Sequence, residues 1–346
     1  MRNRAPVHEK LREDLKKKIL DRRLPPGVML SPENALTATY GISRPSVRKA
    51  LAELESERLI VRRPGLGTFV GDIDLKKARP DGPDLIGIDL SESDMESWYY
   101  LELLKGARKG CHDMNCGLFF FDEDDFSRMP DTPLKGLILT RFDQWPSEKV
   151  DLLRRRGVPV VALNRFPVGM GCNWVAADFE KASFKAVEHL IQLGHRRIGV
   201  VADDNPPVGG ARRKGYLEAL AKYKIPIAED LIFVRTPGQN IMDDAMAFLR
   251  DSGATAYFFA NASYFGSYFS PALSRLQIRI PEKVSIIVFE DIEGHVPHHG
   301  PALSCVRVPL RDMGRRAAQI VAGHSGGEVH EIFACELVIR ESCGSV

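Results

Sequence analysis

The sequence of 346 residues predicts an α/β protein in which an N-terminal winged helix-turn-helix precedes a two-lobed body of doubly wound parallel sheets. Three observations support this prediction. Residues 1–71 contain three amphipathic helical segments followed by two short β-like runs. Residues 72–83 are polar, include Pro and Gly, and have the composition of a linker. In the remaining chain, 84–346, strand-like runs alternate with helical segments over more residues than one such sheet uses.

Charge divides the chain at the same place as the secondary-structure pattern. The head, residues 1–71, holds 15 Lys and Arg against 8 Asp and Glu, which gives +7 and leaves −5 for the rest of a chain whose total is +2. A basic head on an acidic body favours contact of the head alone with a polyanion such as nucleic acid. Chance clustering on a solvated surface is the alternative interpretation at this point.

Composition argues against several other classes of protein. The six cysteines show neither CxxC nor a paired metal spacing, so we expect reduced thiols and no bound metal. The N-terminus is charged throughout and lacks the apolar core of a signal peptide. No apolar run approaches the ~20 residues of a membrane span. We therefore expect a cytoplasmic protein with no membrane contact.

Capping signals divide the head into its elements. An apolar stripe predicts a helix from Val7 to about Leu24. Ser31 as N-cap and Pro32 at the first helical position predict a second helix, which ends near Tyr40 with Gly41 as its C-terminal cap. A third helix ends near residue 58, and two strands at 59–63 and 67–71 follow, joined by a Pro-Gly turn.

The third helix carries the residues that could bind DNA. With Ser43 as N-cap, Pro45 falls in the first turn, where the backbone N–H has no intrahelical partner to lose. Arg44 and Arg48 are one turn apart, so they share a face, and their guanidinium groups suit a guanine edge or phosphates. Ser46 and the helix N-terminus can also hydrogen-bond a phosphate. A basic helix with an ordinary solvated face is the alternative.

Three blocks of the head resemble, in register over about residues 7–71, the DNA-binding domain of the gluconate-repressor (GntR) family of bacterial transcription factors. They are LxxGVMLSPENAL, GISRPSVRKALxxL and RRPGLGTFV. The resemblance implies that the third helix enters the major groove with Arg44, Ser46 and Arg48. It also implies that the wing meets the minor groove, through Arg63, Gly65, Leu66 and Gly67.

The head departs from the family pattern at two places. The Pro-Ser-Glu-Arg usual at the start of the second helix is Ser31-Pro32-Glu33-Asn34 here. We therefore expect Glu33 and Asn34 to contribute a weaker DNA contact than the family arginine. Leu66 stands where the wing often carries an arginine between its glycines, which removes a charged contact to the minor groove.

Polar residues in the body follow the apolar runs at their ends. The predicted strands are 85–90, 117–121, 136–140, 158–163, 197–202, 256–260 and 284–289. Ligands of open α/β sheets bind at the carboxyl ends of the strands. The residues placed there are Asn164, Arg212, Asn261, Glu290 and Asp291. Together they predict a cleft for a small polar ligand, whereas any one alone could instead cap a neighbouring helix.

The body resembles the effector domain of the lactose/galactose-repressor (LacI/GalR) family, itself similar to periplasmic sugar-binding proteins, from about residue 85 to 343. The motifs are HLxxLGHxRI, RxxGYxxAL, IPxxVSxxxFxD and ELxxRES. The resemblance implies that Arg212 clamps the ligand and that Asn164, Asn261 and Glu290 contact it. Trp98 and Tyr99 occupy the block whose aromatics line the family pocket, and core packing is the alternative for them.

These resemblances also predict how the body is divided. We expect lobe 1 at about 84–176 and 306–324, and lobe 2 at about 177–305 and 325–343. The sequence departs from the family where the usual Asn-Asp is Asn261-Ala262 and where Gly-Phe-Asp-Asp is Val288-Phe289-Glu290-Asp291. A simple hexose ligand is therefore not implied.

The two resemblances together are those of an arabinose-repressor-type regulator. They imply a homodimeric repressor that binds double-stranded, pseudo-palindromic operator DNA and is controlled by a small polar effector, a sugar or related metabolite, with no cofactor. An activator of the same architecture, a non-sugar ligand and an enzyme-like body are the alternatives. His295, His298 and His299 lack acidic or Cys partners at metal spacing, so a solvated loop is favoured over a metal site.

Overall fold

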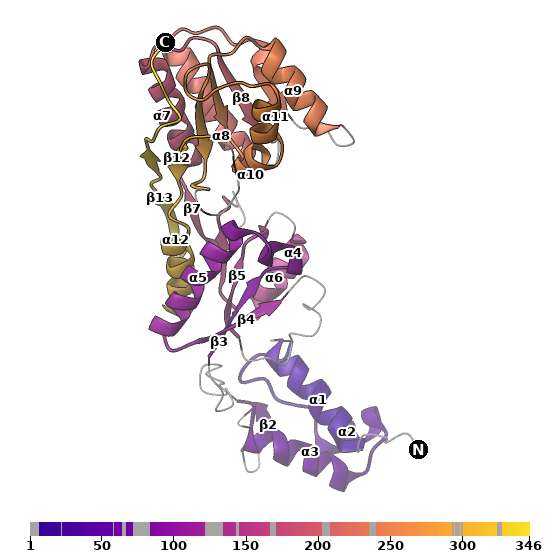
Figure 1. The fold of residues 1–346 in the computed structure, drawn as a ribbon. Helices are drawn as coiled ribbons and strands as arrows, with labels where there is room; N and C mark the ends of the chain where they lie inside the picture. Colours follow the sequence, from indigo (N-terminus) through magenta and orange to yellow (C-terminus); the bar gives the residue numbers. More distant parts are fainter. Residues whose placement is uncertain are drawn as a thin grey trace.

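The computed structural model describes residues 7–21, 23–57, 59–63, 67–71, 84–121, 134–142, 145–166, 171–202, 208–234, 240–292, 294, 298, 300–323 and 327–346. The expected linker at 72–83 lies outside them. Within the described ranges, no helix is long and apolar enough to cross a membrane. The head, the first lobe and the second lobe follow one another along an elongated molecule, with the head at one end and the C-terminus at the other (Figure 1).

The head is the predicted winged helix-turn-helix. It consists of α1 (Val7–Leu20), α2 (Glu33–Tyr40), α3 (Arg44–Ser56), and the antiparallel strands β1 (Ile60–Arg63) and β2 (Gly67–Val70). Its own core is made by one apolar stripe from each helix, chiefly Leu11, Leu15, Ile19, Leu36, Val47, Ala50, Leu51 and Leu54. Because this core is separate from those of the body, the head has its own source of stability.

The ends of the head helices follow local capping chemistry with two corrections. Gly41 is left-handed at φ 64°, as a C-terminal cap requires, and Ser43 accepts a hydrogen bond from the Ser46 N–H at 3.3 Å. The first helix ends at Leu20, earlier than expected. Pro32, not Ser31, is the N-cap of α2, because its ψ of 151° is extended and its carbonyl already accepts the Leu36 N–H.

The body contains two six-stranded sheets in which every pairing is parallel except one. The first has the order β13-β7-β6-β5-β3-β4 and consists of β3 (Leu85–Asp89), β4 (Gly117–Phe121), β5 (Leu134–Leu139), β6 (Val160–Leu163), β7 (Asn173–Ala177) and β13 (His330–Phe333). The second has the order β14-β12-β11-β10-β8-β9 and consists of β8 (Ile198–Ala202), β9 (Ile232–Val234), β10 (Ala256–Phe259), β11 (Ser285–Phe289), β12 (Ser304–Arg307) and β14 (Glu336–Val338).

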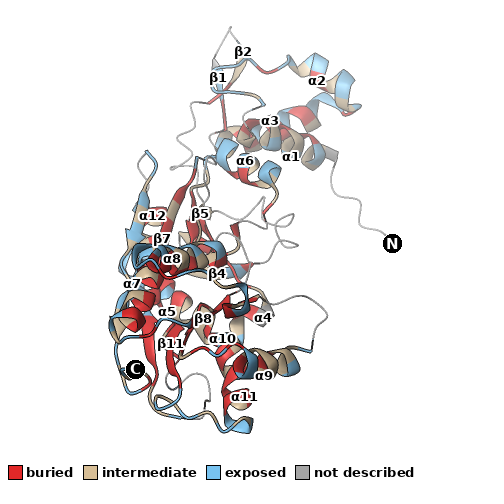
Figure 2. Ribbon diagram, turned by 90° about the horizontal axis from the view of Figure 1, so that it is seen from above, coloured by how far each residue is buried: buried red, intermediate tan, exposed pale blue. Residues whose placement is uncertain are grey.

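Helices cover both sheets, which is why the central strands β8, β10 and β11 are buried along their whole length (Figure 2). Lobe 1 carries α4 (Glu92–Met95), α5 (Trp98–Asp113), α6 (Ser147–Arg155) and α12 (Leu310–Gly323). Lobe 2 carries α7 (Phe179–Gln192), α8 (Val208–Lys222), the 3₁₀ turn η3 (Glu229–Leu231), α9 (Ile241–Asp251), α10 (Ala262–Tyr264), the π-helix η4 (Phe265–Phe269) and α11 (Ser270–Arg275).

The chain crosses between the lobes three times, and this corrects the expected lobe boundaries. It leaves β7 for α7 at Asp178, leaves β12 for α12 at 308–309, and leaves β13 for β14 at 334–335. His330–Phe333 therefore belongs to lobe 1, because it pairs in parallel with β7, whereas the sequence had placed 325–343 in lobe 2. Val306 and Arg307, expected in lobe 1, are in β12 of lobe 2.

Glycines allow α5 and α12 to pack backbone against backbone in lobe 1. A Cβ on Gly314 of α12 would lie 2.1 Å from the Leu103 carbonyl oxygen, and one on Gly106 of α5 would lie 2.0 Å from the Arg311 carbonyl oxygen. Such distances leave no room for any side chain, so the separation of the two helices depends on these glycines.

We predict that Gly314→Ala lowers the free energy of unfolding by about 1–3 kcal/mol, because the helices must move apart to accommodate the methyl group. Thermal or urea unfolding measures this. Gly323→Ala is the matched control: the position is in the same helix, its added Cβ has nothing within 4 Å, and stability should not fall. Equal melting of the two variants would contradict the close-packing account.

His195 fastens the C-terminal segment to lobe 2. The residue is buried, with Nδ1 2.8 Å from the Thr255 hydroxyl and Nε2 2.9 Å from the Ser285 hydroxyl and 3.1 Å from the Gly344 carbonyl. Burial lowers the pKa of His195 below its ordinary value, and the bond to Gly344 opposes this only in part. The imidazole is therefore neutral in the folded protein at neutral pH.

We predict that His195 makes the fold less stable as the pH falls below about 6.5, the ordinary pKa of histidine. The pKa is lower in the folded state, so the unfolded chain binds the proton first and is favoured by acid. The unfolding free energies of wild type and His195→Gln, measured by urea titration at neutral and mildly acidic pH, should converge on acidification. A constant difference between them would count against the prediction.

Candidate DNA interface and ligand cleft

Helix α3 presents its arginines to solvent next to the start of α2. The Arg44 guanidinium donates to the Asn34 side-chain oxygen, and the Arg48 Nε donates to the Glu33 carboxylate at 3.0 Å. All four of these side chains lie on the exposed or half-exposed surface of the head. Glu33 and Asn34, expected to contact DNA weakly, thus pair with the two arginines in the free protein. Their effect on the candidate interface is therefore indirect, through the arginines of α3.

Ser46 and the wing form the rest of the candidate interface. The Ser46 hydroxyl lies 2.9 Å from the Ser43 hydroxyl, within the N-terminal cap of α3. Gly67 begins β2 at φ 122°, and a Cβ there would meet the Met29 sulfur at 3.3 Å, so a glycine suits this position. Gly65 and Leu66 lie outside the described residues, as does the side chain of Arg63.

Arg212 is the centre of the lobe 2 side of the cleft. It projects from α8 and is only 4% exposed. Its Nη1 donates to the Ala260 carbonyl at 2.7 Å and its Nη2 to the Glu290 carboxylate at 2.8 Å, while its guanidinium carbon lies 4.1 Å from the centre of the Phe289 ring. Its Nε is buried without a hydrogen-bond partner in the described structure. A guanidinium held on two sides whose Nε–H has no described acceptor can bind an acceptor on a ligand.

Two non-glycine residues at strand ends have left-handed backbones. Glu290 follows β11 with φ 85°, and Asn164 follows β6 with φ 64°. Non-glycine residues rarely adopt this conformation, and they concentrate at ligand sites. The Asn164 Oδ1 is buried and accepts no hydrogen bond within the described residues. The sequence prediction that both belong to one site is consistent with this geometry.

Tyr99 connects the two sides of the cleft. Burial raises the pKa of its hydroxyl, the nearby Glu290 raises it further, and Arg212 and Arg165 act in the opposite direction. The tyrosine ring packs against a buried apolar cluster that contains residues of both lobes. Its hydroxyl is a third buried polar atom without a hydrogen-bond partner among the described residues. The unused acceptors and donors on both lobes make a site suited to a hydroxyl-rich molecule.

Trp98 and Asn261 occupy different roles at the edge of the site. Trp98 packs against the apolar clusters of both lobes and lines a pocket of about 300 Å³ together with Glu290. The Asn261 side-chain oxygen instead accepts the Ser263 N–H at 2.9 Å and caps α10. The alternative stated for a single strand-end residue, that it caps a neighbouring helix, therefore describes this oxygen of Asn261.

Sequence reasoning missed several residues at the site. Arg165 directly follows Asn164, and Phe179 lies 5.2 Å from the Arg212 guanidinium. Asp89, at the carboxyl end of β3, is buried and accepts the Trp145 Nε1–H at 2.9 Å. Burial raises the pKa of Asp89 to about 6, although these hydrogen bonds lower it. The strand-end rule that found Asn164 would also have found Asp89 if the predicted strand LIGIDL had been ended at its aspartate.

Neither a metal centre nor a disulfide is present among the described residues. No group of three His, Cys, Asp or Glu side chains there could hold a metal ion, and none of the six cysteines forms a disulfide. Of the three histidines considered for a metal, His295 and His299 lie outside the described residues.

Two protein-family models match this chain, one in its N-terminal part and one in its C-terminal part. Residues 7–70 match the family of bacterial regulatory proteins called gntR, and residues 187–343 match the periplasmic binding protein-like domain. The chain joins a gntR-family DNA-binding domain to a periplasmic binding protein-like domain. This is the architecture of a ligand-responsive transcriptional repressor, and the whole-length relatives agree with it.

Those relatives are the arabinose metabolism transcriptional repressors of Geobacillus stearothermophilus and Halalkalibacterium halodurans. The first is 24% identical over 97% of this chain and 97% of its own length, and the second is 23% identical over 96% and 95%. The regulator GalR of Salmonella typhimurium is 32% identical over 53% of this chain and 55% of its own. It therefore matches about half of each protein.

Solved structures with the same body fold include a LacI-family regulator from Enterococcus faecium with bound ribose. It is 22% identical, has a TM-score of 0.63, and covers 76% of this chain and 100% of its own. The Escherichia coli repressor ascG is 21% identical, with a TM-score of 0.62 and coverage of 76% and 100%. These similarities establish the two-lobed fold of the body.

Proposed function

We propose that this repressor binds a pseudo-palindromic operator as a homodimer and responds to a sugar or a related polar metabolite bound between its lobes. The observation that carries the proposal is the buried Arg212–Glu290 pair, which lies at the carboxyl ends of parallel strands, together with buried polar atoms of lobe 1 that bond to none of the described residues. The exposed arginines of α3 support the DNA-binding half of the proposal.

The ligand class rests on two further observations. Relatives that match along their whole length are arabinose metabolism repressors, and a structural neighbour was solved with ribose. The Tyr99 hydroxyl, Asn164 Oδ1 and Arg212 Nε, which have no hydrogen-bond partner in the described part of the chain, offer both acceptors and donors, as a polyhydroxyl ligand requires. The aromatic Trp98 at the edge offers a ring on which a sugar face can stack.

Control of DNA binding requires a difference in affinity. A ligand shifts the equilibrium between an open and a closed body only if it binds the two unequally, and operator DNA must likewise favour one of them. We propose that closure of the lobes changes the distance between the two heads of the dimer. A two-fold dimer then matches a two-fold operator in only one of the two states.

We predict that Arg44→Ala weakens binding to the operator by about 1–3 kcal/mol, because a bidentate base contact is lost. Fluorescence anisotropy with the palindromic site from the promoter of its own gene, and with random DNA of equal length, measures this. Lys49→Ala is the control. This exposed residue of α3 is expected to contact the DNA backbone and not a base, so the affinities for both DNAs should fall slightly and by the same factor. The regulator proposal fails if the wild type shows no preference for the palindrome.

We predict that removal of the Arg212 guanidinium abolishes the response to effector while operator binding persists. The variant is Arg212→Ala combined with Glu290→Gln, so that no buried carboxylate is left unpaired. L-Arabinose and D-ribose are the probes, and thermal shift and operator anisotropy are the measurements. A sugar that stabilises the wild type should leave this variant unchanged. Loss of operator binding as well would show that the pair serves folding instead.

A further inference from the structure

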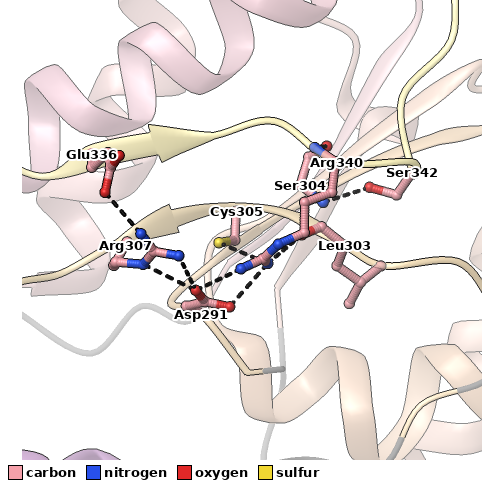
Figure 3. Close-up of polar contacts among 8 residues, drawn as sticks. All are labelled: Asp291, Leu303, Ser304, Cys305, Arg307, Glu336, Arg340 and Ser342. Carbon is pink, nitrogen blue, oxygen red and sulfur yellow. Dashed lines mark hydrogen bonds and ion pairs between the residues drawn. The ribbon is translucent and has the colours of Figure 1, made fainter. Parts of the chain in front are cut away.

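The carboxylate that follows Glu290 in the chain holds a separate network at the surface of lobe 2. Arg340 donates Nη1 and Nη2 to the two oxygens of Asp291 at 2.9 and 2.8 Å, which is a bidentate fork. Arg307 donates Nε and Nη2 to Oδ2 of the same carboxylate at 3.0 and 2.8 Å. Figure 3 shows Asp291 between the two guanidinium groups.

This network joins two of the three segments that cross between the lobes. Arg307 is the last residue of β12, immediately before the crossing at 308–309. Glu336 is the first residue of β14, immediately after the crossing at 334–335, and it accepts the Arg307 Nη1–H at 2.9 Å. Arg340 follows β14 and also donates to the Leu303 carbonyl at 2.7 Å. Asp291 therefore ties the outgoing and the returning segment together (Figure 3).

The backbone next to Asp291 connects this network to the ligand site. Glu290 and Asp291 are consecutive, and the left-handed backbone of Glu290 lets their side chains bind different partners: Glu290 binds Arg212, and Asp291 binds Arg307 and Arg340. The Glu290 N–H donates to the Val306 carbonyl at 2.8 Å, one residue before Arg307. The backbone of Glu290 is thus bonded to the strand that leads into the second crossing.

The first crossing is in contact with the same pair. Phe179, at its lobe 2 end, lies 5.2 Å from the Arg212 guanidinium and 5.9 Å from Phe289. Asp178, within the crossing, donates its N–H to the Phe333 carbonyl at 2.9 Å and so reaches the start of the third crossing. Phe179 beside the first crossing therefore contacts Arg212, and Arg307 beside the second contacts Asp291, while Glu336 beside the third reaches Asp291 through Arg307.

The electrostatics show that Asp291 is firmly held. Burial acts to raise its pKa, but the hydrogen bonds from Arg340 and Arg307 outweigh this and lower the pKa to about 2. Its side chain is only 19% exposed, so these contacts are poorly screened, whereas Glu336 is 65% exposed and contributes little. The carboxylate between the two arginines is the part of the network that restrains the crossings.

We propose that Asp291 is a positioning residue that couples ligand binding at Glu290 and Arg212 to the angle between the lobes. It does so by clamping Arg307 and Arg340, and hence the second and third crossings, to the strand end that carries Glu290. This inference rests on the proposed function in that the ligand is taken to bind Arg212 and Glu290. The clamp itself is a property of the chain without ligand, and it can be tested in that state.

The first arm of the test is hydrogen exchange of the full-length protein without ligand. Asp291→Asn should speed exchange in peptides that span 304–312 and 333–340, because both crossings lose their common restraint, while peptides of α3 and β5 stay unchanged. Asp251→Asn is the matched control: it removes one carboxylate from an exposed ion pair of lobe 2 that contacts no crossing, and exchange should stay as in wild type. Uniformly faster exchange throughout lobe 2, or no change at the crossings, would overturn the proposal.

The second arm measures binding and coupling separately. With L-arabinose and D-ribose as probes, Asp291→Asn is titrated with whichever sugar binds the wild type and is then compared with the wild type at saturating sugar, so that sugar affinity and coupling are measured separately. The factor by which that sugar alters operator affinity should fall by about tenfold. Asp291→Glu, which keeps the charge, should recover part of that factor. Loss of sugar binding equal to that of the Arg212→Ala, Glu290→Gln variant would make Asp291 a binding residue and overturn the proposal. If neither sugar binds the wild type, L-arabinose and D-ribose are excluded as effectors, and the exchange arm still decides the role of Asp291.

Discussion

Arg212 must be neutralised because its guanidinium is almost wholly removed from water, and much of the body is arranged to do so. An isolated buried charge would cost several kcal/mol, and a single ion pair repays this only with good geometry and further hydrogen bonds. The Glu290 carboxylate, the Ala260 carbonyl and the faces of two phenylalanines provide these contacts. They come from the ends of β10 and β11 and from the start of α7, so the pair holds together the part of lobe 2 that faces lobe 1.

The arginines of α3 in the head, unlike Arg212, are exposed to water. The Arg48 side chain is 65% exposed, so its pair with Glu33 is worth roughly 0–1 kcal/mol and competes weakly with phosphate or guanine. Glu33 and Asn34 can therefore orient the arginines of α3 in the free protein without preventing their transfer to DNA. The binding groups of the body are fixed before ligand arrives, whereas those of the head are only loosely placed.

The sequence predicted those parts of the structure that depend on local chemistry. Ser43, Pro45 and Gly41 specify the turn between α2 and α3 through capping and backbone preference alone, and the structure has that turn. The strand-end rule located Glu290 because the apolar run VSIIVF is buried on both faces and visible as an unbroken stretch, whereas Arg212, expected in a loop ahead of a helix, lies within α8. The Ser31 cap failed because Pro32 adopts an extended backbone that no local pattern distinguishes from a first helical turn.

Features that depend on distant contacts were not visible in the sequence. His330–Phe333 alternates exposed and half-buried positions at the edge of a sheet, and its pairing with β7 spans about half of the chain. The side chain of Asn261 has two uses of similar chemistry, and only the position of the Ser263 N–H shows that its oxygen caps α10. In the same way, no sequence pattern predicts the ion pair between Asp291 and Arg340, because the two side chains are brought together only when the chain returns to lobe 2 through the third crossing.

Coupling between a ligand and DNA has to pass through the crossings, because they are the described covalent connections between lobe 2 and the rest of the chain. Ligand binding at Glu290 is favoured at the lobe angle at which both lobes contact the ligand. By linkage, the operator changes the affinity for ligand by the same factor as the ligand changes the affinity for the operator. A crossing that moved freely would let lobe 2 close without displacing lobe 1 or the head. Restraint at Asp291, on the residue next to the ligand carboxylate, converts a local shift of that carboxylate into a rotation of the lobes.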